Sequence, residues 1–212
     1  FGISLSVSDL AFSLDGSTIL VLVGGYEETR ASGDPVTWAI ALDGRTLSML
    51  GAPVRTAGGI EAPGAAIAAG VGGTFWFATQ LRGTDYGTLT GVETGADGLT
   101  RFAEVPVTGV AHTIRLAAAP DRRGCAYSAG RRLSYWGTAE RKAITFADTI
   151  SVVRWEGARV FVGEADRAHV IEAAAETPSA TVHFDTGFVV DIVSLDRGGV
   201  APRGDSALFK RL

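Results

Sequence analysis

Short runs of strand-forming residues joined by tight turns recur along the whole chain, and this pattern constrains the fold more than any other feature. Two such runs flank Asp15-Gly16, and two more flank Asp43-Gly44. Asp-Gly between β-rich runs is a strong hairpin signal, because glycine adopts the positive φ that tight hairpin turns need. The first fifty residues therefore contain four expected strands, at 6–14, 18–25, 36–42 and 47–50. Four consecutive antiparallel strands form one blade of a β-propeller.

The same pattern recurs with first-strand centres roughly 38–57 residues apart, a range that brackets the ~40–45 residues of a propeller repeat. The sequence predicts one all-β domain of five four-stranded blades, at 7–50, 60–105, 111–146, 149–184 and 188–212. The fourth blade is expected to have strands at 150–155, 159–162, 168–173 and 181–184, and the fifth at 188–195, 200–202 and 207–211. Residues 1–6 are expected to complete the last blade as its outer strand. A ring closed in this way leaves no exposed sheet edge, and we expect a monomer. Two other folds fit short strands of this kind, namely a β-sandwich and part of a larger propeller.

One hairpin carries a family resemblance. The segment Val7-Ser-Asp-Leu-Ala-Phe-Ser-Leu-Asp-Gly-Ser-Thr-Ile-Leu20 resembles the first hairpin of WD40-like and YVTN-type bacterial propeller repeats, and 189–198 resembles it more loosely. The Trp-Asp pair of true WD40 repeats is absent, because the four tryptophans are followed by Ala, Phe, Gly and Glu. The resemblance implies the architecture and a bacterial source. It implies no particular activity, since one fold serves many functions.

Charge and cysteine content exclude several classes of partner. The net charge of −4 provides no long-range attraction for nucleic acid. No stretch approaches the ~20 apolar residues that span a bilayer, so no membrane span is expected. Cys125 is the only cysteine, which suits a reducing compartment. We expect a cytoplasmic protein, with secretion left open. The chain begins at Phe1, which indicates a processed product or part of a longer protein.

Catalytic signatures are missing from the sequence. It contains no phosphate-binding loop, no paired-cysteine metal motif, no His-Glu-x-x-His and no Gly-x-Ser-x-Gly. The three histidines, His112, His169 and His183, lie in separate repeats without the spacing of metal ligands. We therefore expect neither an enzyme nor a bound cofactor or metal.

The loops between second and third strands are the candidate site, because they emerge together on one face of a propeller. Every one of them contains Arg, and four of the five add a carboxylate. The candidate residues are Tyr26, Glu27, Glu28, Arg30, Asp34, Arg82, Asp85, Tyr86, Arg131, Arg132, Glu164, Asp166, Arg167, Arg203 and Asp205. Arg and Tyr are frequent anchors of protein interfaces. The pattern predicts a scaffold or sensor module that binds a protein partner or a neighbouring domain, with 26–35 as the main contact segment.

The carboxylates of these loops also allow a different function. A glycosidase-like propeller uses paired carboxylates at the channel mouth, and the candidates are Glu27, Glu28, Asp34, Asp85, Glu164 and Asp205. Binding of Ca²⁺ by several carboxylates is a variant of the same idea. Polar residues are also usual in surface loops of any protein. Two carboxylates about 5–9 Å apart in a cleft favour hydrolysis, whereas a channel filled by Ala and Val opposes it.

Overall fold

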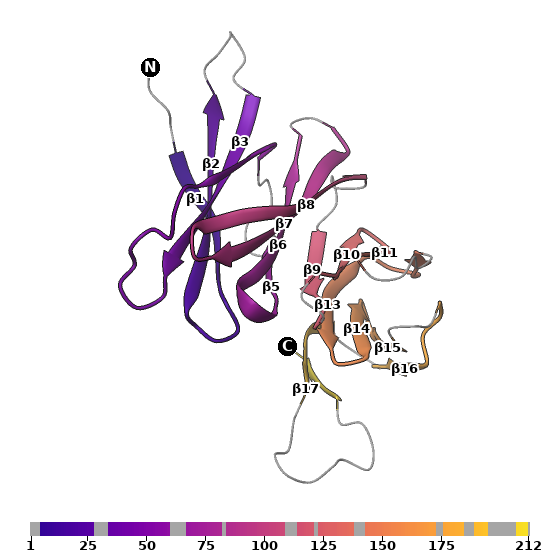
Figure 1. Ribbon diagram of the computed structural model, residues 1–212. Coiled ribbons are helices and arrows are strands. Elements are labelled where there is room, and N and C mark those ends of the chain that lie inside the picture. Colours follow the sequence, from indigo (N-terminus) through magenta and orange to yellow (C-terminus); the bar gives the residue numbers. More distant parts are fainter. Residues whose placement is uncertain are drawn as a thin grey trace.

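The computed structural model describes residues 5–27, 34–59, 67–81, 84–108, 114–120, 123–137, 143–172, 176–184, 189–194 and 207–211 (Figure 1). The first sheet contains β1 (Leu5–Phe12), β2 (Thr18–Glu27), β3 (Asp34–Asp43) and β4 (Val54–Ala57). The second contains β5 (Ile67–Ala69), β6 (Thr74–Gln80), β7 (Tyr86–Gly95) and β8 (Gly98–Thr108). The third contains β9 (Ile114–Ala118), β10 (Cys125–Ala129), β11 (Arg132–Trp136) and β12 (Ile144–Thr145). The fourth contains β13 (Ile150–Glu156), β14 (Arg159–Glu164), β15 (Arg167–Glu172) and β16 (Ala180–His183), and β17 (Val189–Ser194) pairs with β18 (Ala207–Arg211).

Each four-stranded sheet is a meander whose spatial order follows the chain. The first strands β1, β5, β9, β13 and β17 each contact the next one, which places them around a common axis (Figure 1). Among the described residues the only helical element is a short 3₁₀ turn, Val71–Gly73. The expectation of an all-β chain built from four-stranded units is confirmed.

Hydrophobic side chains join each sheet to the next. Leu20 and Leu22 of the first sheet pack with Phe75 of the second. Trp76 on the other face of β6 packs with residues of the third sheet, and a similar cluster joins the third sheet to the fourth. Val189 of β17 closes the last cluster against Phe161 and Ala168. Both faces of the middle sheets are therefore buried, and the core lies between sheets.

The turn between β1 and β2 shows how local chemistry directs the chain. Gly16 has φ of 70°, a conformation that favours glycine. One carboxylate oxygen of Asp15 accepts hydrogen bonds from Ser13 Oγ at 2.7 Å, Ser17 Oγ at 2.8 Å and the Ser17 amide at 3.0 Å. These donors, with Ser13 first, lower the pKa of Asp15 from 3.8 to about 2.

We expect the Asp15 turn to make stability depend on pH in the acid range. A carboxyl whose pKa is lower in the folded state stabilises the fold above its unfolded pKa, and this contribution is lost as pH falls through the folded value. The difference in free energy of unfolding between the parent and Asp15→Asn should therefore be constant above pH 5. It should shrink between pH 4 and about 2. Urea titrations at several pH values measure this, and a difference that does not vary with pH contradicts the assignment.

The strand pairing corrects the expected fourth strand of the first sheet. This strand is Val54–Ala57 and not 47–50, where Met49 makes only an isolated bridge to Leu42. Asp43 Oδ1 accepts from the amides of Arg45 and Thr46, so the chain turns there, and the continuous ladder with β3 is formed by Val54–Ala57.

The last unit also differs from expectation. Leu5 and Ser6 pair with Gly25 and Gly24 as part of β1, so these two residues do not form a separate closing strand. Residues 1–4 and the expected strand at 200–202 lie outside the described residues. β18, expected as a third strand, pairs directly with β17 and is therefore a second strand.

Candidate functional site

The starts of the first strands and the ends of the second strands lie at one end of the axis. Ile150, which begins β13, pairs with Glu164, which ends β14. A cavity of about 420 Å³ opens there, at the mouth of the space between the first strands. Its lining residues are Arg115, Asp148, Thr149, Ile150, Ser151, Ala165 and Val189. The hollow therefore lies at the end of the axis from which the loops between second and third strands emerge, and Ala165 of one such loop lines it.

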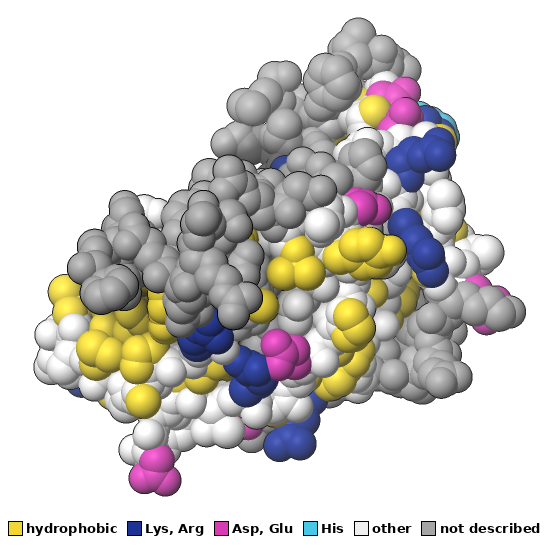
Figure 2. All heavy atoms as spheres, turned by 90° about the horizontal axis from the view of Figure 1, so that it is seen from above, with side chains coloured by type: hydrophobic (Ala, Val, Ile, Leu, Met, Phe, Trp, Pro, Cys, Tyr) yellow, Lys and Arg dark blue, Asp and Glu magenta, His cyan; other side chains and the backbone are white. Residues whose placement is uncertain are grey.

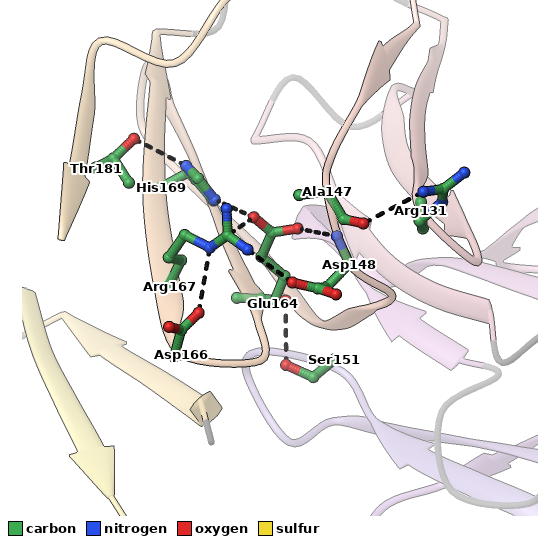
Figure 3. Close-up of polar contacts among 10 residues, drawn as sticks. Arg131, Ala147, Asp148, Ser151, Glu164, Asp166, Arg167, His169 and Thr181 are labelled. Carbon is green, nitrogen blue, oxygen red and sulfur yellow. Dashed lines mark hydrogen bonds and ion pairs between the residues drawn. The ribbon is translucent and has the colours of Figure 1, made fainter. Parts of the chain in front are cut away.

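Glu164 is the centre of a polar cluster beside this mouth (Figure 3). Its side chain is only 1 % exposed. One carboxylate oxygen lies 2.9 Å from His169 Nε2, and the other accepts a hydrogen bond from the Asp148 amide at 2.7 Å. The second ring nitrogen of His169 lies 2.9 Å from Thr181 Oγ1. Because both carboxylate oxygens have partners, the buried charge is compensated.

Arg167 extends the cluster to the surface (Figure 3). Its Nε lies 3.2 Å from Asp166 Oδ1 and 3.5 Å from Glu164 Oε1. A terminal nitrogen donates to Asp148 Oδ2 at 2.7 Å. The negative charge of Glu164, helped by Asp166 and Asp148, raises the pKa of Arg167. This arrangement joins the β14–β15 turn to the segment that enters β13.

Arg115 has a different environment on the inner strand β9. Its Nε donates to the main-chain oxygen of Ser151 at 2.6 Å, and burial lowers the pKa of its guanidinium. A second, long hydrogen bond goes to the main-chain oxygen of Ile114. Within the described residues no carboxylate pairs with Arg115. The mouth of the axis thus contains a half-buried cation that lacks a counter-ion there.

The opposite end of the axis is mainly apolar. A cavity of about 640 Å³ is lined there mostly by Ala, Val, Ile and Leu side chains of β5, β9 and β13. Arg154 and Glu156, which also line it, form an ion pair with each other. The described carboxylates that the glycosidase alternative named belong to the loop end, and none of them lines this cavity.

The structure brings together only some of the residues that the sequence predicted for the site. Glu164, Asp166 and Arg167 come together, and Arg131 donates to the main-chain oxygen of Ala147 beside the same cluster (Figure 3). Arg132 begins β11 and is exposed, and Tyr86 begins β7 and is 60 % exposed. Asp85 lies in the preceding bend.

The longest expected loop is shorter than predicted. Tyr26 and Glu27 end β2, and Asp34 begins β3 by pairing with Glu27. Glu28, Arg30, Arg82, Arg203 and Asp205 lie outside the described residues. Because β18 is a second strand, Arg203 and Asp205 belong to the connection between first and second strands and not to a connection between second and third strands.

Sequence reasoning missed Arg115, Asp148, His169 and Thr181. These residues come from strands and from the connection that enters β13, which the loop comparison left out. In a meander the end of every second strand adjoins the start of the first, so the entering connections belong to the same face. That rule of topology is the signal that could have found Asp148.

Comparison with known proteins supports the fold and nothing narrower. No protein-family model matches the chain, and no curated protein matches it. Among solved structures it is similar to Saccharomyces cerevisiae Sqt1, with TM-score 0.57, 11 % identity and coverage of 97 % of this chain and 68 % of that one. It is also similar to hydrazine synthase of Kuenenia stuttgartiensis, with TM-score 0.55, 15 % identity and coverage of 89 % and 52 %. The chain has a β-propeller fold. Each four-stranded sheet is one blade of it.

Among the described residues, no three His, Cys, Asp or Glu side chains gather as possible metal ligands. In the same part of the chain, no helix has the length and apolar character needed to cross a membrane.

Proposed function

We propose that this propeller is a non-enzymatic protein-binding module whose contact surface is the end of the axis that contains Arg115 and the Glu164 cluster. The observation that carries the proposal is the half-buried Arg115 at the rim of an open hollow, without a carboxylate partner among the described residues. Removing a guanidinium from water without a counter-ion is costly. An Asp or Glu side chain of a partner protein would supply that counter-ion.

The surroundings of the hollow support a protein ligand. Arg131 and Arg132 are exposed beside the hollow, while Tyr86 adds an exposed aromatic ring on the same end of the second sheet. Arg forks pair with carboxylates through two hydrogen bonds, and Tyr and Arg are common interface anchors. Carboxylates of the Glu164 cluster lie at the same end as these cations, a mixture of charges that disfavours a nucleic-acid backbone.

The partner can be found by crosslinking from the proposed surface. A photoreactive residue at Tyr86 should crosslink another polypeptide in host cells, whereas one at Leu47, near the far end of β3, should not. The crosslinked protein is then purified for titration.

Charge reversal provides the quantitative test. Arg131→Glu combined with Arg132→Glu should raise the Kd for the purified partner at least tenfold, and Arg115→Gln should do the same. The matched control is Arg45→Glu, an exposed arginine after β3 at the opposite end. All variants should melt within a few degrees of the parent. Equal Kd values for the control and the Arg131/Arg132 variant contradict the proposal.

A further inference from the structure

The face of the first sheet that points away from the second sheet is apolar over three strands. Across this face Val7 pairs with Val23, Leu10 with Val21 and Phe12 with Ile19, and the next strand adds Trp38, Ile40 and Leu42 in register. Directly opposite residues of antiparallel strands share a face. These nine residues, here called the outer face, include no polar side chain.

A bulge in β1 creates this alignment. The register shifts between Val7 and Asp9, so Ser8 is an extra residue. If residues 7–12 formed a regular strand with no bulge, Leu10 and Phe12 would point to the side opposite Val7, because side chains alternate along a strand. The bulge instead places Val7, Leu10 and Phe12 together.

The outer face is exposed along β1. Val7 is 64 % exposed, Leu10 52 % and Phe12 54 %, whereas Ile19 is buried at 7 %. The other residues of the face, on β2 and β3, are half-buried. Figure 2 shows hydrophobic side chains gathered at the end of the molecule where the first sheet lies. A continuous apolar surface of this kind marks an interaction site.

The fourth sheet provides an internal comparison. β13 has the same bulge, between Ile150 and Val152, and its register matches that of β1. Ile150 and Val153 stand where Val7 and Leu10 stand in the first sheet. They are only 1 % and 7 % exposed, because they pack on Leu133 and neighbouring residues of the third sheet.

The other sheets repeat this arrangement. Leu116 and Tyr127 of the third sheet pack on the second, and Phe75 and Phe77 of the second pack on the first. Val189 of β17, also next to a bulge, packs on the fourth sheet. In every described sheet except the first, the corresponding face is covered by the preceding blade.

We infer that the outer face of the first sheet is an inter-blade interface, covered by a further blade of the same polypeptide that lies outside residues 1–212. The occupant is a four-stranded antiparallel sheet that presents branched and small apolar side chains, as Leu20, Leu22 and Ala39 do toward the second sheet. It continues an interface that this chain already repeats. The two solved structures that the chain resembles extend beyond the matched part, which covers 68 % and 52 % of them.

The inference is tested in the protein as its host produces it, with p-benzoylphenylalanine in place of Leu10. We expect a crosslink within one polypeptide, to a segment outside residues 1–212 with the strand-and-turn pattern of a blade. Peptide mapping and the mass of the crosslinked species identify the segment. A crosslink to a second copy, to an unrelated protein or to β17 and β18 of the same chain overturns the inference, as does no crosslink.

Substitution gives a second, independent readout. Leu10→Lys should lower the Tm of the host-produced protein by about 5 °C or more, because an unpaired ammonium would be buried under the further blade. Val182→Lys is the matched control, since Val182 is an exposed apolar residue on the outermost strand β16. It should shift the Tm by about 2 °C at most. Equal shifts for the two variants contradict a covered face.

Discussion

Replacing Glu164 by alanine should lower the free energy of unfolding by about 3 kcal/mol, because removal of one partner from a buried charged cluster leaves the others uncompensated. His169 Nε2 and the Asp148 amide would both lose their acceptor, and Arg167 would lose its buried counter-charge. Glu164→Gln keeps the shape and one acceptor, so it should cost less. Urea unfolding followed by far-UV circular dichroism measures the change.

Asp166 offers the matched control for Glu164. It pairs with the same Arg167, but its side chain is exposed in the β14–β15 turn. Exposed ion pairs contribute about 0–1 kcal/mol, so Asp166→Ala should unfold almost as the parent does. Equal losses for Glu164→Ala and Asp166→Ala would show that burial of the carboxylate is unimportant.

The Trp76→Ala substitution should lower the free energy of unfolding by about 3–5 kcal/mol, the usual cost of removing a large aromatic side chain from a core. Trp76 is completely buried between the second and third sheets. Its ring makes edge contacts with Phe102, at 5.3 Å between centroids, and with Trp136, at 4.9 Å. Gly91 lies against these rings, since a Cβ there would come within 2.6 Å of Phe102.

Trp155 provides the control for this core position. It is half-buried at the end of β13, and its indole N–H donates to the main-chain oxygen of Gly157. Trp155→Ala should therefore cost clearly less than Trp76→Ala in the same urea titration. The interpretation of Trp76 as the packing centre between two blades fails if the order of the two is reversed.

Most of the fold was predictable from residues close together in the sequence. The strands of the fourth sheet were expected at 150–155, 159–162, 168–173 and 181–184, and the structure has them within a few residues of those bounds. Turn residues such as Asp15 and Gly16 act on their immediate neighbours, so their effect is visible without tertiary structure. The first sheet was less predictable, because its fourth strand depends on where β3 finds a partner after the Asp43 turn.

The candidate site was predictable only in part. Glu164, Asp166 and Arg167 are neighbours in one hairpin, so the loop comparison found them. Asp148 and Thr181 reach the same cluster from other strands and connections. Arg115 joins the mouth because β9 lies beside β13 around the axis. No local pattern in the sequence reports that proximity.

By itself the sequence determined the class of fold, the repeat of four strands and the loop end that contains the charged residues. These follow from side-chain alternation and turn chemistry, which act over a few residues. The tertiary structure decided which carboxylate is buried, which arginine lacks a counter-ion among the described residues and which apolar face is uncovered. Burial depends on how whole sheets pack. Leu10 and Val153 have equivalent places in their strands, and only the presence of a neighbouring blade makes one exposed and the other buried.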